Sequence, residues 1–131
     1  MYAAVRRDGL LILDVSDPSA PEEIGRCVTP GIAQDVTIMG DYAFVSRWSE
    51  GLQVIDISSP GNPEIAGNLE TTDSTWEVVI RENYGYIAND DNGLVVINLD
   101  NPVIPRIVAN YCNRGTIMDV EAVERYAYVA V

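Results

Sequence analysis

The 131-residue chain has no histidine and no lysine, and it has only two cysteines. Without imidazole, the chain by itself cannot supply a histidine general base, a serine–histidine–aspartate triad or a histidine metal ligand. Two cysteines are also too few for a zinc site built from cysteine alone. No apolar run approaches the roughly 18 residues of a membrane-spanning helix. We therefore expect neither histidine-based catalysis nor insertion into a membrane.

The charge of the chain is strongly one-sided. It carries 20 acidic residues against 8 basic ones, all of them arginine, and its formal net charge is −12 at pH 7. A surface of this sign repels the phosphates of nucleic acids and anionic lipids. We therefore predict no nucleic-acid partner, and we expect most of the acidic residues to be solvated at the surface.

One pattern occurs three times in the chain. It reads GLLILDVSDPSAP from residue 9, GLQVIDISSPGNP from residue 51 and GLVVINLDNPVIP from residue 93, which gives a constant spacing of 42 residues. Aligned at this spacing, six columns are identical in all three copies. They are Gly9/Gly51/Gly93, Leu10/Leu52/Leu94, Pro18/Pro60/Pro102, Pro21/Pro63/Pro105, Val36/Val78/Val120 and Tyr42/Tyr84/Tyr126. A period of this length indicates a repeat architecture.

Each repeat contains four short segments with the composition of β-strands. In the central copy they span residues 33–39, 42–48, 52–58 and 64–71, with glycine, proline, asparagine and aspartate between them. The glycine that begins each copy of the pattern ends a tight reversal, where a positive φ is needed. The Pro-x-x-Pro segment lacks two amide donors and therefore has to connect strands rather than extend one.

Four short antiparallel strands per repeat are typical of a β-propeller blade. We predict an all-β fold in which residues 1–131 form one domain, a partial β-propeller of four-stranded antiparallel blades. It comprises a partial blade (1–28), two whole blades (33–71 and 75–112) and the start of another (117–131). Because propellers close with roughly four to eight blades, about three blade equivalents form an arc. Closing the ring then requires self-association or the remainder of a longer chain. The valine and tyrosine columns, which are identical in all three copies, are the predicted blade core.

The repeated segments resemble those of the LVIVD-repeat family. The likeness lies in LLILD (10–14), LQVID (52–56) and LVVIN (94–98), each after a glycine and before the proline connection. It extends upstream to DYAFV (41–45), NYGYI (83–87) and RYAYV (125–129). The resemblance implies a β-propeller-like domain of bacterial and archaeal secreted or cell-surface proteins, with no established reaction. The expectation of an extracellular or cell-surface location rests on this resemblance alone.

Candidate functional residues gather at one end of the predicted arc, which we call the loop face. It carries the connections between blades and the turn between the second and third strands of each blade. Asp35, Glu77 and Asp119 share one column there, at the start of the innermost strands. Their carboxylates would suit a cation or a basic ligand at the mouth of a central channel. The alternative, which we favour, is that they bind backbone amides or pair with arginine between blades.

Trp48, Trp76 and Arg47 also belong to the loop face. Exposed tryptophan would form a hot spot for a protein or carbohydrate ligand, whereas buried tryptophan would pack between blades. Arg47 would meet an anionic group or offset the neighbouring acids. Asp90 and Asp91 lie in an oxygen-rich turn that is a weak candidate for Ca²⁺, because it lacks the alternating spacing of an EF-hand loop. No other cofactor is predicted.

These observations favour a non-catalytic binding or scaffolding module with a protein or carbohydrate ligand. Two alternatives remain open. One is a segment of a propeller enzyme of the lactonase or hydrolase type, with a metal held by the acidic column. The other is a purely structural spacer, in which no ligand changes the stability of the chain and both tryptophans are buried.

Overall fold

The computed structural model describes residues 1–112 and 115–131, which form β-strands and one short 3-10 helix. The strands group into four sheets, three of which we call blades and the last the final hairpin. Blade 1 contains β1 (Tyr2–Val5), β2 (Gly9–Asp14) and β3 (Glu22–Cys27). Blade 2 contains β4 (Ala33–Met39), β5 (Tyr42–Arg47), η1 (Trp48–Glu50), β6 (Gly51–Asp56) and β7 (Glu64–Leu69). Blade 3 contains β8 (Glu77–Arg81), β9 (Tyr84–Ala88), β10 (Leu94–Asn98) and β11 (Arg106–Tyr111). The final hairpin contains β12 (Asp119–Val123) and β13 (Tyr126–Ala130).

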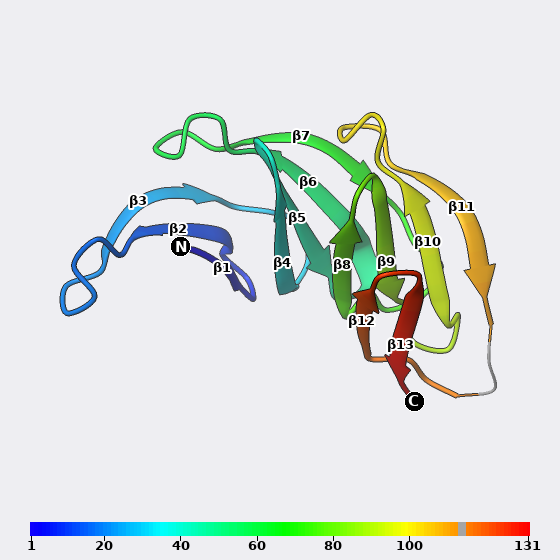
Figure 1. Ribbon diagram of the computed structural model, residues 1–131. Coiled ribbons are helices and arrows are strands. Elements are labelled where there is room, and N and C mark those ends of the chain that lie inside the picture. Colours follow the sequence, from blue (N-terminus) through cyan, green and yellow to red (C-terminus); the bar gives the residue numbers. More distant parts are fainter. Residues whose placement is uncertain (113–114) are drawn as a thin grey trace.

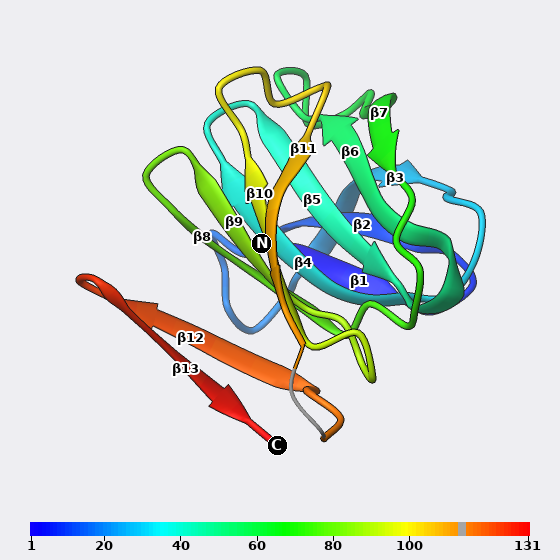
Figure 2. The same cartoon turned by 90° about the vertical axis from the view of Figure 1, so that its right-hand side faces the viewer.

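Every sheet is an antiparallel meander, in which strands that are consecutive in sequence pair with one another. The spatial orders are β1-β2-β3, β4-β5-β6-β7, β8-β9-β10-β11 and β12-β13. The sheets follow one another in an arc, with β4, β8 and β12 side by side along its inner side (Figure 1). The perpendicular view shows blade 1 and the final hairpin as separate ends of the arc (Figure 2). The prediction of an all-β partial propeller is confirmed.

The turn glycines explain how each hairpin at the loop face closes. Gly9, Gly51 and Gly93 have φ values of +78°, +73° and +82°. Residues that carry a Cβ rarely adopt such backbone angles. At Gly51 an added Cβ would also lie 2.2 Å from the carbonyl oxygen of Leu69. The residues before Gly51 form η1 instead of extending β5, so Trp48 is in the turn and not in the strand.

The outermost strand of each blade carries a β-bulge at the same repeat position. The register shifts between Ile12 and Leu13 in blade 1, between Val54 and Ile55 in blade 2, and between Val96 and Ile97 in blade 3. A bulge bends the strand and increases its twist. The three blades thus share this local geometry as well as their strand order.

The hydrophobic core lies between the blades, in contacts that we call joints. In the joint between blades 1 and 2 (joint 1–2), Leu10 and Ile12 cluster with Val45 and Ile55. In joint 2–3, residues of blade 2 pack against residues of blade 3. This cluster contains Phe44, Leu52, Val54, Val78, Ile87, Val95, Ile97 and Leu99. A smaller cluster of Ala88, Ile117 and Val120 joins blade 3 to the final hairpin.

The predicted core columns differ in how well they are buried. In the valine column, Val78 and Val120 are 0% and 2% exposed, and Val36 packs against joint 1–2. The tyrosine column was predicted to be core throughout, and this is wrong. Tyr42 is partly buried against joint 2–3, but Tyr84 and Tyr126 are 41% and 56% exposed.

The outer edges of successive blades also touch. A Cβ added to Gly25 of β3 would lie 2.0 Å from the carbonyl oxygen of Pro60, and one added to Gly67 of β7 would lie 2.1 Å from that of Val103. Pro60 and Val103 belong to the proline connections of the following blades. The outermost strand of one blade therefore meets the backbone of the next with no space for a side chain.

Cys27 is a buried free thiol and Cys112 an exposed one. Burial raises the pKa of the Cys27 thiol above its ordinary value.

Within the described residues, none of the helical structure is long and apolar enough to cross a membrane.

Candidate functional site

The acidic column connects the inner strands of neighbouring blades. Glu77, at the start of β8, accepts a hydrogen bond at Oε2 from the backbone N–H of Val120 in β12, at 2.9 Å. Asp35 of β4 is likewise hydrogen-bonded by the backbone N–H of Val78 in β8. Each carboxylate therefore binds the inner strand of the following unit. This geometry favours the structural interpretation of the column, in which the acids bind backbone amides between blades.

The pKa values of two of these acids are nevertheless raised above their ordinary values. Burial raises the pKa of Asp35, against the lowering effect of its backbone hydrogen bonds. For Glu77, burial, a hydrogen bond with the Asp119 carboxyl and the charges of Asp119 and Asp35 together raise the pKa to about 7. Like charges in a partly desolvated site favour retention of a proton. Glu77 therefore keeps its proton to a higher pH than an ordinary glutamate does.

The two tryptophans lie against each other across the connection between blades 2 and 3. Their ring centroids are 5.5 Å apart with an interplanar angle of 34°. Trp76 is partly buried against the cluster of Ala88, Ile117 and Val120, and its buried indole N–H has no hydrogen-bond partner. Trp48 is 38% exposed. Trp76 thus packs between blades, and Trp48 presents its ring to solvent.

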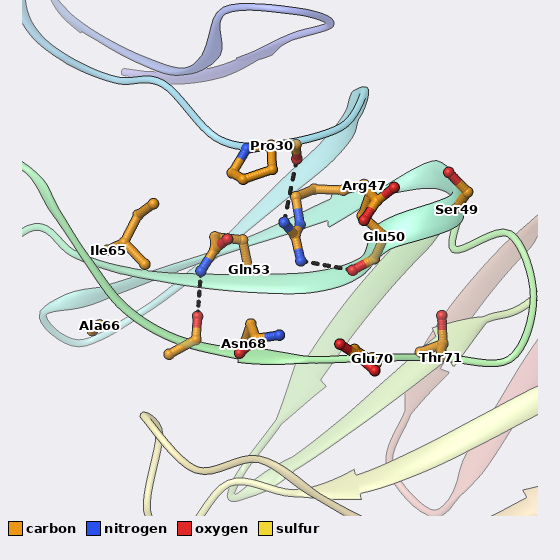
Figure 3. A pocket seen from close by; sticks show the side chains of 11 residues that line it. Pro30, Arg47, Ser49, Glu50, Gln53, Ile65, Ala66, Asn68, Glu70 and Thr71 are labelled. Carbon is orange, nitrogen blue, oxygen red and sulfur yellow. Dashed lines mark hydrogen bonds between the residues drawn. The ribbon is translucent and has the colours of Figure 1, made fainter.

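Arg47 lies at an open pocket of about 520 Å³ in joint 1–2 (Figure 3). The residues that line the pocket come from the linker between blades 1 and 2, from the β5–β6 turn and from β6, β7 and the segment after β7. They are Pro30, Arg47, Ser49, Glu50, Gln53, Ile65, Ala66, Gly67, Asn68, Glu70 and Thr71. The lining is mixed, with amide, hydroxyl and carboxylate groups beside three apolar side chains, those of Pro30, Ile65 and Ala66.

Arg47 is only 4% exposed as a residue, and its guanidinium holds two segments of backbone together. One terminal nitrogen donates to the carbonyl oxygen of Pro30 at 3.2 Å, and the other donates to that of Glu50 at 2.6 Å. Its Nε–H is buried without a hydrogen-bond partner. Burial lowers the pKa of Arg47, while the charges of Glu50 and Glu70 act in the opposite direction. Arg47 is therefore a desolvated cation at the wall of a pocket.

The repeat places a related pocket in joint 2–3, with about 190 Å³ of space. Asn89 stands there at the position of Arg47, 42 residues later. It is fully buried, and its side-chain amide donates to the carbonyl oxygens of Asp73 and Ser74 and to Oγ1 of Thr75. The two residues perform the same structural task, which is to attach the incoming linker to the blade. The pocket with Asn89 is smaller and has no buried charge.

Comparison with known protein families agrees with this architecture. The LVIVD repeat matches four consecutive segments, residues 1–29, 30–71, 73–113 and 114–131. The chain belongs to the LVIVD-repeat family. The boundaries of the matches follow the 42-residue period of the blades. A search of curated proteins found no match.

Within this LVIVD-repeat chain, the remaining predicted site residues are not brought into one site. Oδ1 of Asp91 accepts a hydrogen bond from the Thr116 hydroxyl at 2.8 Å, and the backbone carbonyl of Asp90 accepts from the Ile117 N–H. Across residues 1–112 and 115–131, no three histidine, cysteine, aspartate or glutamate side chains form a group that could hold a metal ion. A Ca²⁺ site needs about six to eight oxygen ligands, and this turn does not supply such a set.

Sequence reasoning named Arg47 but missed the groups that share its pocket. Gln53, Asn68 and Glu70 lie on strands or connections that the repeat pattern marks only as blade structure. A signal was present in the Arg47 column, which reads Val5, Arg47, Asn89 and Val131. A charged residue in a column that is otherwise apolar or neutral indicates that this joint contains a charged group that the other joints lack.

Proposed function

We propose that this LVIVD-repeat segment is a non-catalytic ligand-binding module within a propeller of a secreted or cell-surface protein. The observation that supports it is the polar pocket in joint 1–2, with the buried Arg47 at its wall. Ligand pockets commonly combine concave shape with a few fixed polar groups. Family membership supports the proposed location outside the cytoplasm.

The test is a thermal-shift screen of the purified chain, followed by calorimetric titration of each compound that raises the melting temperature. The panel contains neutral sugars, amino acids, simple carboxylates and simple amines. A saturable rise caused by one class supports a binding module. No shift with any compound would contradict the proposal and favour a structural spacer.

A second candidate function is hydrolysis at the acidic column, favoured by the raised pKa of Glu77 beside Asp119. A carboxyl that is protonated near neutral pH can act as a general acid. Its test is turnover of lactone and phosphoester substrates with and without Ca²⁺. Turnover that disappears in Glu77→Gln would establish this function and overturn the non-catalytic one. A Ca²⁺-induced rise in melting temperature that survives in Asp35→Asn/Glu77→Gln would place the ion elsewhere.

A further inference from the structure

The charge of Arg47 has no direct counter-ion within residues 1–112 and 115–131. The ion pairs within 4.0 Å in this part of the chain both involve Arg26. Arg47 has instead two neutral carbonyl oxygens and an unpartnered Nε–H. A buried cation is stable only when its environment compensates the charge. The pocket therefore has an unmet requirement for a negative group next to Arg47.

The rim of the pocket has the opposite charge. Glu50 and Glu70 both line it, both are solvent-exposed, and both act on Arg47 through their charges, although neither carboxylate forms an ion pair with it within 4.0 Å. Figure 3 shows Glu70 on the segment that follows β7, across the pocket from Arg47. A plain anion would be attracted by Arg47 and repelled by the two acids. A plain cation would be attracted by the acids and repelled by Arg47.

We propose that the pocket in joint 1–2 binds a small zwitterion, with its carboxylate at Arg47 and its ammonium group at Glu50 and Glu70. This inference rests on the proposed binding function and names the chemical class of the ligand. Free amino acids have this chemistry. Gln53, Asn68 and Thr71 supply further polar groups along the same pocket.

The related pocket in joint 2–3 offers a comparison inside the same molecule. Its residue at the Arg47 position is the neutral Asn89, whose amide is fully engaged with the linker. Asn92 occupies the position of Glu50 there, and although Glu70 lines this pocket too, no arginine faces it, so the pair of opposite charges is absent. We expect no zwitterion binding at that joint, and the stoichiometry is one ligand per chain.

The experiment is calorimetric titration of the folded chain with four probes at low salt. They are glycine, γ-aminobutyrate (a zwitterion of wider charge spacing), propionate (the anion alone) and propylamine (the cation alone). We expect one of the two zwitterions to bind at one site and both single-charge probes to bind more weakly. Propionate binding as tightly as the better zwitterion would overturn the inference.

Three variants locate the site. Arg47→Gln removes the buried charge and should weaken zwitterion binding about tenfold or more, as expected for a charge-assisted hydrogen bond. Arg81→Gln changes the net charge equally but alters an exposed arginine of β8, and it should leave the affinity unchanged. Glu70→Gln should weaken zwitterion binding and strengthen propionate binding, because it removes a repulsion.

Glu70 is exposed, so its variant keeps the test decisive if Arg47→Gln fails to fold. Unchanged zwitterion affinity in Glu70→Gln would contradict the inference. Binding of a neutral sugar alone would overturn the zwitterion assignment and leave the proposed binding function intact. No binding by any compound of the panel would overturn both.

Discussion

Joints 1–2 and 2–3 are built from the same repeat, yet they attach their linkers with different chemistry. Joint 1–2 uses a guanidinium that reaches two carbonyl oxygens and keeps its charge at a pocket of about 520 Å³. Joint 2–3 uses a short neutral amide whose donors are all taken by the linker, beside a pocket of about 190 Å³. The common fold thus sets where a pocket can form, and one side chain decides whether it carries an unpaired charge.

The largest expected effect comes from breaking joint 2–3 itself. Val78→Asp would bury an unpaired charge where the side chain is 0% exposed, with an expected cost of about 4 kcal/mol or more. Val36→Asp, at the same repeat position but only partly buried, should cost less. Urea unfolding monitored by circular dichroism measures both. A Val78→Asp variant as stable as the wild type would show that the strand register is incorrect.

The two linker attachments should differ in their contribution to the stability of the ligand-free chain. Asn89→Ala leaves buried carbonyl groups of the linker without donors, so the expected loss in unfolding free energy is about 2 kcal/mol. Arg47→Leu also loses two hydrogen bonds but removes the desolvation cost of the charge, so it should cost less than Asn89→Ala. The urea midpoints of the two variants give the comparison. A larger loss for Arg47→Leu would mean that the charge is compensated within the chain.

The smallest expected effect concerns pH and the acidic column that crosses the joints. A carboxyl whose pKa is raised in the folded state stabilises that state most below its ordinary pKa, and this contribution is lost as pH rises through the folded pKa. For Glu77 the window runs from its ordinary value of 4.5 to about 7. The stability should therefore fall between pH 4.5 and about 7, by about 1 kcal/mol because solvent screens this partly exposed group.

Glu77→Gln is the control for the pH effect. A glutamine can accept from Val120 and donate to Asp119, as the protonated glutamate does, but it does not titrate. The variant should reduce the pH dependence and be more stable than the wild type at pH 8. An undiminished dependence in the variant would assign the effect to other groups, such as Asp35.

The blades could be predicted from the sequence because each one consists of strands that are neighbours along the chain, and because the pattern recurs with a strict 42-residue period. The glycine turns, the strand order and the burial of Val78 and Val120 all follow from local pattern and from the repeat. The burial of the tyrosine column could not be predicted in this way. Tyr42 packs against the cluster of joint 2–3, whereas Tyr84 of blade 3, which is followed by only a two-stranded hairpin, stays 41% exposed. Burial here depends on the neighbouring unit as well as on the repeat.

The candidate site was harder to predict because it also depends on how separate segments of the chain pack against one another. The pocket in joint 1–2 brings together Pro30, Arg47 and Glu70, which belong to different strands and connections, and its shape depends on the spacing between the linker and the strands of blade 2. Sequence periodicity carries no information on that spacing. The pairing of Glu77 with Asp119 likewise follows from the contact between inner strands of separate sheets.

The close contacts of Gly25 with Pro60 and of Gly67 with Val103 have a geometric consequence for the whole arc. Successive blades behave as wedges, and the angle between them grows when their outer edges are held further apart than their inner strands. Glycine at these two positions lets the outer edges approach to backbone contact, which keeps the angular step per blade small. A methyl group at Gly67 would widen that step, so one atom at the rim would change the curvature with which the blades turn about the propeller axis.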